Sequence, residues 1–356
     1  MRQIMFANQT TFYSGSNNPA SVAVGYFDND NELDIVVANI GYINYIYHVA
    51  VFLGIGNGYF RSQTLFPTGS QPYSVAVGDF NNDNRSDIVV ANYNGSSVSV
   101  LLGYGNGTFA NQMMFPTGSQ PYSVAVGDFN NDNRSDIVVA NYNGSSVSVL
   151  LGYGNGTFAS QRIFPAGNGP RSIAVGDFND DNQLDIVVAN DGSMNGIFNV
   201  GLLLGYGNGT FASQITFSDG YRPYSVTVGD FNNDNRLDIA MANYFSDNVG
   251  VRLGYGNGTF AGQKTFTTGA GPWSVAVGDF NNDNRSDIAV ANYNGFNVGV
   301  LTGDGDGAFP NQTTYSTGVS SFPNAIAVGD FNNDDRSDIV VANFVSHSMG
   351  ILLNVS

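Results

Sequence analysis

The fold is decided by the stretch Ser74-Val75-Ala76-Val77-Gly78-Asp79-Phe80-Asn81-Asn82-Asp83-Asn84-Arg85-Ser86-Asp87-Ile88-Val89-Val90-Ala91-Asn92, of which the chain holds seven near-copies. The acidic part of each copy begins at Tyr26, Asp79, Asp128, Asp177, Asp230, Asp279 and Asp330, which gives a repeat of 49 to 53 residues. Residues 66–110 and 115–159 are identical, which indicates a recent duplication. A fixed period of this length is typical of propellers and other repeat architectures.

Each repeat is interpreted as four short strands. The first covers Ser74 to Gly78, and the second, 88–91, is continuously apolar, as expected of a strand buried on both faces. The third covers 97–102 and alternates at its start. The turn 103–107 then contains Asn-Gly and leads into a fourth strand near 109–115. Four antiparallel strands at this period predict one propeller blade.

The two ends of the chain predict how the ring closes. Residues 6–12 resemble the fourth strand of a repeat, and the chain ends after a third strand, 349–355. The N-terminal segment should therefore complete the last blade and remove an open edge. We predict an all-β protein, a seven-bladed β-propeller of four-stranded antiparallel blades, with residues 1–356 forming one domain.

Composition excludes several functions. The chain has 12 basic and 29 acidic residues and a formal charge of −17, which argues against nucleic acid and anionic membranes as partners. It has no cysteine, so disulfides and thiolate chemistry are excluded. No apolar stretch approaches the roughly 20 residues of a membrane span. Residues 1–6 lack the apolar core of a secretory signal.

The loop between the first two strands is a candidate metal site. Counting Asp79 as position 1, oxygen-bearing side chains fall at positions 1, 3, 5 and 9, and the position-7 carbonyl can add a ligand. Hard oxygen donors in this number suit Ca²⁺, which takes six to eight, better than Mg²⁺, which requires stricter octahedral geometry. With no cysteine and two histidines, zinc and copper are disfavoured.

The pattern predicts about one Ca²⁺ per blade, six or seven in total. The first loop departs, because position 1 is Tyr26, and we expect weaker binding there or none. The predicted ligands are Asp28, Asp30, Asp34; Asp79, Asn81, Asp83, Arg85, Asp87; Asp128, Asn130, Asp132, Arg134, Asp136; Asp177, Asn179, Asp181, Gln183, Asp185; Asp230, Asn232, Asp234, Arg236, Asp238; Asp279, Asn281, Asp283, Arg285, Asp287; and Asp330, Asn332, Asp334, Arg336, Asp338.

The alternative is that these loops are Asx-rich turns that need no metal. Charge weighs against it, because 23 of the 28 aspartates lie in the seven loops, where they would repel one another without a cation. Seven Ca²⁺ would add +14 and bring the formal charge from −17 to −3. Such calcium would be structural rather than catalytic.

The motif 77–87, followed by Leu-Leu-Gly-Tyr-Gly-Asn-Gly-Thr-Phe at 101–109, resembles the FG-GAP repeat, also described as the VCBS-type repeat. The resemblance covers essentially the whole chain. That family includes the seven-bladed propeller of integrin α-subunits, surface proteins and a fungal lectin, and its acidic loops bind calcium. The resemblance implies the same for the loops above, Tyr26 excepted. This chain has Asn84 where many family loops have Gly, so Asn must adopt the left-handed conformation there.

Propeller geometry places the acidic loops and the Gly-rich turns on one face. Aromatic, amide and charged residues are expected on the opposite face, where they suit ligand recognition; the alternative is that the rings only pack between blades. These residues are Tyr73, Tyr93, Asn94, Tyr122, Tyr142, Asn143, Arg171, Asp191, Tyr221, Arg222, Tyr224, Tyr244, Phe245, Trp273, Tyr293, Phe296, Phe322, Phe344 and His347.

Catalytic residues are scarce. Glu32 and Lys264 are the single Glu and Lys of the chain, and His48 and His347 have no recurring partner. Outside the acidic loops the aspartates are Asp191, Asp219, Asp247, Asp304 and Asp306. Glycoside hydrolysis needs two carboxylates about 5–10 Å apart across a sugar, and no such pair stands out. We therefore predict that the protein is not an enzyme.

Two main functions remain, with a purely structural repeat array as a third possibility, and fold does not decide among them. The first is an adhesion or protein-interaction scaffold, and the alternative is a multivalent calcium-dependent lectin that binds glycans opposite the calcium loops or between blades. We expect a monomeric propeller with a protein or glycan ligand. Sites of this kind fill at millimolar calcium, so we expect an extracellular or cell-surface location.

Overall fold

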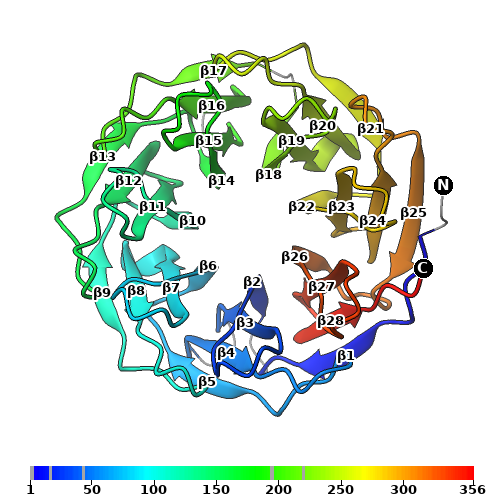
Figure 1. Ribbon diagram of the computed structural model, residues 1–356, viewed down its shortest axis with the longest axis horizontal. Coiled ribbons are helices and arrows are strands. Elements are labelled where there is room, and N and C mark those ends of the chain that lie inside the picture. Colours follow the sequence, from blue (N-terminus) through cyan, green and yellow to red (C-terminus); the bar gives the residue numbers. More distant parts are fainter. Residues whose placement is uncertain (1–3, 16–17, 42–44, 193–195, 219–220) are drawn as a thin grey trace.

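A computed structural model describes residues 4–15, 18–41, 45–192, 196–218 and 221–356. Asp219 lies outside the described residues. The chain forms seven four-stranded antiparallel sheets arranged around a central axis, as Figure 1 shows. The predicted all-β, seven-bladed propeller is confirmed. Among the described residues, no helix is long and apolar enough to cross a membrane.

The blades are numbered in chain order, and blade 7 contains the N-terminal strand. Blades 1 to 3 are β2 (Pro19–Gly25), β3 (Asp34–Asn39), β4 (His48–Phe52), β5 (Thr64–Pro67); β6 (Pro72–Gly78), β7 (Asp87–Asn92), β8 (Ser97–Leu101), β9 (Met113–Pro116); and β10 (Pro121–Gly127), β11 (Asp136–Asn141), β12 (Ser146–Leu150), β13 (Arg162–Pro165). Blades 4 and 5 are β14 (Pro170–Gly176), β15 (Asp185–Asn190), β16 (Asn199–Leu203), β17 (Ile215–Phe217); and β18 (Pro223–Gly229), β19 (Asp238–Asn243), β20 (Asn248–Arg252), β21 (Lys264–Thr267). Blades 6 and 7 are β22 (Pro272–Gly278), β23 (Asp287–Asn292), β24 (Asn297–Thr302), β25 (Asn311–Ser316); and β26 (Pro323–Gly329), β27 (Asp338–Asn343), β28 (Ser348–Leu352), β1 (Thr10–Tyr13). Two single-turn 3₁₀ helices, η1 (Tyr93–Gly95) and η2 (Tyr244–Ser246), follow β7 and β19.

The core lies between the blades. In β7, Ile88 and Val90 pack against blade 1, and Val89 and Ala91 pack against blade 3. All four side chains are fully buried. A strand whose side chains alternate between two dry interfaces must be apolar at every position, which explains the unbroken run 88–91. The sequence prediction for this strand is confirmed.

The fourth strand starts later than the sequence predicts. Phe109 makes only an isolated bridge to Gly103, and continuous pairing begins at Met113. The Phe109 ring instead enters the interface with blade 1, where its centroid lies 5.5 Å from Phe27 and 5.0 Å from Phe66. The Phe109 ring is thus buried between blades, and regular pairing of the fourth strand with β8 begins only after it.

The ring closes as predicted. β1 pairs with β28, with Thr10 opposite Ile351, and Phe6 bridges to Asn354 as Phe109 does to Gly103. In Figure 1 the N-terminal strand lies at the outer edge of the last blade, near the C-terminus. The N-terminal segment therefore supplies the fourth strand of blade 7 and leaves no gap in the ring.

Candidate functional site

The acidic loops and the Gly-rich turns share one face, as the sequence predicts. In blade 2, the acidic loop connects β6 to β7 and the Gly-rich turn follows β8. The N–H of Gly103, in that turn, donates to Oδ1 of Asp87 at 2.7 Å. β6 and β7 pair with Gly78 opposite Asp87 at the acidic loop and Pro72 opposite Asn92 at the other end. Tyr73 and Tyr93 belong to that other end and therefore lie on the opposite face. The molecule therefore has an acidic face and an aromatic face.

Position 9 of each loop is a buried anchor. Oδ1 of Asp87 accepts the Gly103 N–H, and Oδ2 accepts the Phe80 N–H at 2.8 Å. The equivalent aspartates of the other blades, Asp34, Asp136, Asp185, Asp238, Asp287 and Asp338, make the same pair of bonds and are also fully buried. This residue therefore ties the acidic loop to the turn after the third strand.

Burial also changes the acidity of this anchor. Removal from water raises the pKa of Asp87 to about 6, although its two backbone hydrogen bonds act in the opposite direction. The same cause raises the pKa of Asp287 to about 7. A cation close to these carboxylates would favour their charged form.

Positions 1 and 5 shape the loop. Oδ1 of Asp79 accepts the N–H groups of Asn81 and Asp83, and its Oδ2 accepts that of Asn84 at 2.8 Å. Oδ1 of Asp83 accepts the Arg85 N–H at 3.0 Å. Asn84 adopts φ +60°, so the expected left-handed conformation at this position is confirmed.

In four of the seven loops, position 3 carries an oxygen atom without a hydrogen-bond partner, whereas Oδ1 of Asn81, Asn232 and Asn281 accepts the N–H of the position-5 aspartate. Oδ1 of Asn130, Asn179 and Asn332 is buried and has no partner, and neither has Oδ1 of Asp28 in the first loop. A buried oxygen with no donor is costly and rare in native proteins. A cation in the loop would satisfy it, and the other donors are carboxylate oxygens, which Ca²⁺ prefers. The residues present therefore fit a calcium ion.

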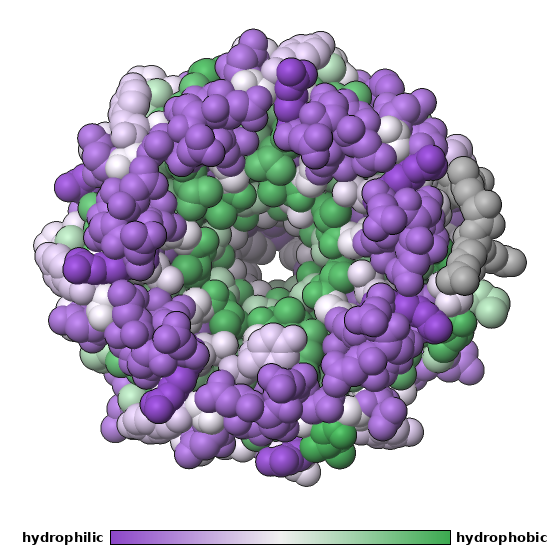
Figure 2. All heavy atoms as spheres, viewed as in Figure 1, coloured by the Kyte–Doolittle hydropathy of each residue, from purple (hydrophilic) through white to green (hydrophobic). Residues whose placement is uncertain are grey.

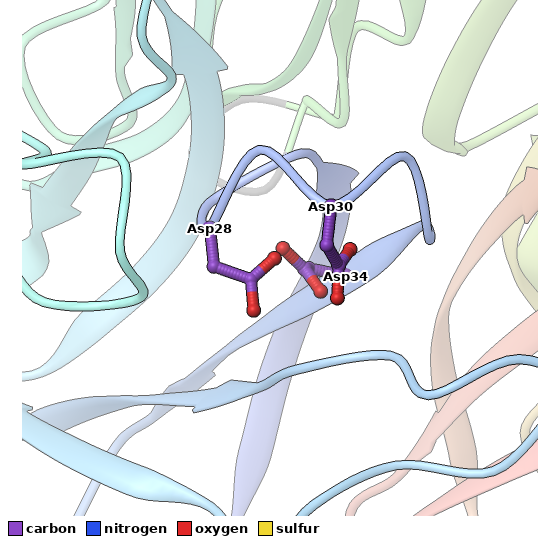
Figure 3. A group of neighbouring side chains, drawn as sticks. All are labelled: Asp28, Asp30 and Asp34. Atoms are coloured by element: carbon purple, nitrogen blue, oxygen red, sulfur yellow. The ribbon is translucent and has the colours of Figure 1, made fainter.

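The first loop holds a distinct cluster. Oxygen atoms of Asp28, Asp30 and Asp34 lie within 4.8 Å of one another, and Figure 3 shows the three carboxylates converging below the loop. Burial, followed by the neighbouring Asp30, raises the pKa of Asp28. The guanidinium of Arg61 lies 3.9 Å from Asp28. Tyr26, at position 1, is half exposed. Weaker binding or none was expected for this loop, yet it gathers three carboxylates.

The position-7 arginines offset part of the loop charge. The Arg85 guanidinium lies 3.6 Å from the Asp83 carboxylate, and similar pairs join Arg134 to Asp132, Arg236 to Asp234 and Arg336 to Asp334. These pairs are exposed, so each is worth about 0–1 kcal/mol. The predicted ligand role of the position-7 carbonyls, and calcium binding as a whole, remain predictions.

The opposite face is built by a bulge repeated in every blade. In β6 the register shifts between Pro72 and Ser74, so that Tyr73 forms the bulge. The same shift occurs at the second residue of all seven inner strands, namely Ala20, Tyr73, Tyr122, Arg171, Tyr224, Trp273 and Asn324. A bulge re-aims a side chain away from the ladder.

These positions surround a central pocket of about 340 Å³. It is lined by Ala20, Ile40, Tyr73, Tyr93, Tyr122, Tyr142, Arg171, Trp273, Tyr293, Asn324 and Phe344. The lining comes from blades 1, 2, 3, 4, 6 and 7, so the pocket lies on the propeller axis. Figure 2 shows one face of the ring, on which hydrophilic residues gather in clusters around the rim and hydrophobic residues line the hollow at the centre; the pocket described here, with its tyrosines, Trp273, Arg171 and Asn324, is not the hydrophobic surface seen in that view.

Arg171 occupies the centre of the aromatic face. Its guanidinium carbon lies 3.7 Å from the ring centroid of Tyr224 and 4.7 Å from those of Tyr122 and Trp273. The side chain is 9% exposed. Nη1 donates to the fully buried Asp191 at 3.4 Å, whereas Nε is buried without a hydrogen-bond partner.

Asp191 is shared. Its Oδ2 accepts from Arg171, from Nη2 of Arg222 at 3.4 Å and from the Tyr142 hydroxyl at 3.3 Å. Two guanidinium groups therefore meet one carboxylate and leave a net positive charge in an otherwise acidic protein. Burial raises the pKa of Tyr122 to about 12, so this phenol stays neutral at physiological pH.

The sequence prediction for this face was only partly complete. The rings pack across blades, with Tyr73 and Tyr122 centroids 4.9 Å apart, and some of them also line a pocket, while ligand recognition by this face stays a prediction. Ala20, Ile40 and Asn324 were missed, although alignment of the second residue of each inner strand would have found two of them. The pocket lining does not include Asn94, Asn143, Asp191, Tyr221, Arg222, Tyr224, Tyr244, Phe245, Phe296, Phe322 and His347.

Solved structures with this architecture are diverse. BBS1N in complex with ARL6DN is 14% identical, with a TM-score of 0.68 over 98% of this chain and 96% of that one. A putative 6-phosphogluconolactonase from Bacteroides uniformis is 15% identical, with a TM-score of 0.65 over 86% and 88%. A functionally unknown protein from Desulfotomaculum acetoxidans is 12% identical, with a TM-score of 0.58 over 87% and 96%. At these identities the likeness shows the fold alone.

Sequence comparison gives the family. No curated protein sequence matches the chain significantly. The family model described as FG-GAP-like repeat matches residues 27–90, 79–139, 128–188, 177–241, 236–290 and 279–341. These matches overlap and together cover most of the chain, in agreement with the repeated acidic loop and the seven blades. The chain therefore belongs to the FG-GAP-like repeat family.

Proposed function

We propose that this protein is a calcium-stabilised, non-catalytic binding scaffold that recognises a protein partner through its aromatic face. The observation that carries the proposal is the separation of two faces. The acidic loops of all blades lie on one side, and the bulged second residues of the inner strands lie around a pocket on the other. The first arrangement fits a structural cation, and the second fits recognition.

Calcium has a structural role in this proposal. Partnerless oxygens at position 3, together with the nearby carboxylates, support it. At a calcium concentration about ten times Kd, linkage stabilises the folded state by roughly 1.4 kcal/mol per site. Six or seven sites would add roughly 8–10 kcal/mol, which is comparable with the total stability of a typical domain.

Thermal unfolding tests the calcium proposal. The melting temperature in excess EGTA should lie well below that in millimolar CaCl₂, and titration calorimetry of the chelated protein should give a stoichiometry of six or seven. MgCl₂ serves as the matched control and should stabilise less, because Mg²⁺ requires stricter octahedral geometry. Identical melting curves in EGTA and CaCl₂ would refute a structural role for calcium.

A protein partner is supported by apolar side chains that the rim of the aromatic face leaves in solvent. Phe245 is 63% exposed, Val319 93% and Ile46 58%. A propeller of similar fold, BBS1N, is described in complex with another protein, ARL6DN. We also propose a monomer in an extracellular or cell-surface location, where millimolar calcium would fill such sites.

Paired surface variants test the face. Phe245→Ser changes the rim of the aromatic face, and Tyr206→Ser changes a side chain of the acidic face that is equally exposed, at 62%. Affinity purification in calcium buffer with the wild type as bait should capture a partner that F245S loses and Y206S retains. If the partner is lost with Y206S and retained with F245S, it binds the acidic face, which contradicts the proposal.

Glycan binding is the second candidate function. The pocket lining favours it, because tyrosine and tryptophan rings offer apolar surface beside polar groups. A glycan array in calcium buffer separates the candidates. The lining, as described, consists of aromatic and aliphatic residues with Arg171 and Asn324, and this composition supports binding rather than acid–base catalysis.

A further inference from the structure

We infer that the central pocket of the aromatic face binds a sugar that carries a carboxylate, with Arg171 as the carboxylate-recognising group. The inference rests on the proposed function only in using the same face. It starts from Arg171, which lines the pocket, is 9% exposed and has a buried Nε without a hydrogen-bond partner. An unsatisfied buried donor is costly and rare, so the hydrogen-bonding capacity of this guanidinium is not used up by the protein around it.

The charge of the pocket selects an anion. Aromatic cages often bind cations, but here the cage already contains the Arg171 guanidinium, 3.7 Å from the Tyr224 centroid. A second cation would be repelled. The carboxylate of Asp191 is divided between Arg171 and Arg222 and neutralises only one of them. The acidic loops, which would oppose an anion, lie at the other end of the strands.

The walls of the pocket select a sugar ring over an acidic peptide. Its volume of about 340 Å³ lies at the small end of ligand pockets, so it admits one compact group rather than a protein surface. Five lining residues are tyrosines, and Asn324 adds an amide. A pyranose offers apolar C–H faces to the rings and several hydroxyls to these polar groups, whereas an acidic side chain offers little beyond its carboxylate.

Trp273 provides a direct readout. It is the single tryptophan of the chain, it lines the pocket and it lies 4.7 Å from Arg171. Intrinsic tryptophan fluorescence therefore reports on this site alone. We expect a saturable change with glucuronate or galacturonate, and affinity at least roughly tenfold weaker for glucose or galactose, because the charge-assisted hydrogen bonds to Arg171 are missing.

Further probes decide the ligand class. Acetate supplies a carboxylate without a ring, and a short peptide ending in Asp supplies the peptide alternative; both should bind at least tenfold more weakly than the uronates. Equal response to uronates and neutral sugars would remove the role assigned to Arg171. No response to uronates at tens of millimolar, or a stronger response to the peptide, would overturn the inference.

Variants assign the effect to Arg171. R171Q should weaken uronate binding at least roughly tenfold and leave neutral-sugar binding little changed. Arg162→Gln is the matched control, since Arg162 bonds to backbone carbonyls of blade 4 outside the pocket, and it should retain uronate binding. If R171Q unfolds, the comparison of uronate with neutral sugar in the wild type still decides. Failure here leaves the EGTA and F245S tests of the proposed function untouched.

Discussion

At the scale of single residues, the acidic loop gives one residue type different tasks. Asp79 at position 1 accepts three backbone N–H groups of its own loop. Asp87 at position 9 is fully buried and joins the loop to the neighbouring turn through two N–H bonds. Position 3 keeps a buried oxygen without a partner in four loops, as at Asn130, but not at Asn81. Asp79 and Asp87 therefore hold the loop in shape through hydrogen bonds. The partnerless oxygens at position 3 are of the type that a cation would bind.

The position-9 anchor gives a mutational prediction. Asp136→Asn should destabilise the calcium-free protein by about 1–3 kcal/mol, because an amide NH₂ would replace one of the two oxygens that accept the Phe129 and Gly152 N–H groups. The control is Asp180→Asn, an exposed position where other repeats carry Asn. Urea unfolding in EGTA at pH 7 measures both. Equal stability of D136N and D180N would contradict the anchor role.

The raised pKa values of the anchors give a pH prediction. Their folded pKa is about 6–7, against about 3.9 in an unfolded chain. Between pH 4 and 7 the folded state therefore holds more protons than the unfolded state, so stability falls as pH rises through this window. Melting in EGTA from pH 4.5 to 7.5 should show this decline.

Calcium should remove or reverse this fall in stability with rising pH. Its ligands must be deprotonated, so metal binding strengthens as pH rises. In millimolar CaCl₂ the melting temperature should therefore stay level or increase over the same range. A calcium-free protein that becomes more stable toward pH 7.5 would disagree with the burial of the anchors.

At the scale of elements, the blades are held together by bonds that repeat around the ring. The N–H of Val124 donates to Oγ of Ser74 in the preceding inner strand, at 3.2 Å. The N–H of Gly107, in a Gly-rich turn, donates to the Phe27 carbonyl of the preceding acidic loop at 2.8 Å. In blade 7 the chain ends before that turn, and the side-chain amide of Asn354 donates to the Phe280 carbonyl instead, also at 2.8 Å.

This replacement predicts that Asn354 stabilises the closure. Its side chain is 1% exposed, so Asn354→Ala would leave the Phe280 carbonyl without this donor and should cost about 1–3 kcal/mol. The matched control is Asn94→Ala, on an exposed turn of blade 2. Urea unfolding compares the two variants, and proteolysis near residues 4–13 should increase only in N354A. No difference between them would exclude this role for Asn354.

At the scale of the whole molecule, the charge is concentrated on one face. The formal charge is −17, and most aspartates lie in the seven acidic loops. The ring geometry brings these loops to one side, whereas the net positive Arg171–Asp191–Arg222 group lies on the other. The molecule is therefore electrically asymmetric along its axis.

This asymmetry predicts a dependence on monovalent salt. Without calcium, raising NaCl from about 0.02 M to 0.5 M should raise the melting temperature, because screening weakens repulsion between the loops. With calcium bound the same change should have a smaller effect. A chelated protein whose melting temperature does not respond to NaCl would show that loop repulsion contributes little.

The repeat, the blade, the ring and the acidic loop could all be predicted from the amino-acid sequence, because each follows from a pattern along the chain. An apolar run such as 88–91 is possible only between two dry surfaces, and the N-terminal likeness to a fourth strand predicts the closure. The central pocket could not be predicted in this way. A bulge sets one residue of each inner strand out of the ladder, and residues far apart in the sequence become neighbours, such as Arg171 with Tyr122, 49 positions before it, and with Trp273, 102 positions after it. No local pattern contains that contact, since it depends on all blades closing around one axis.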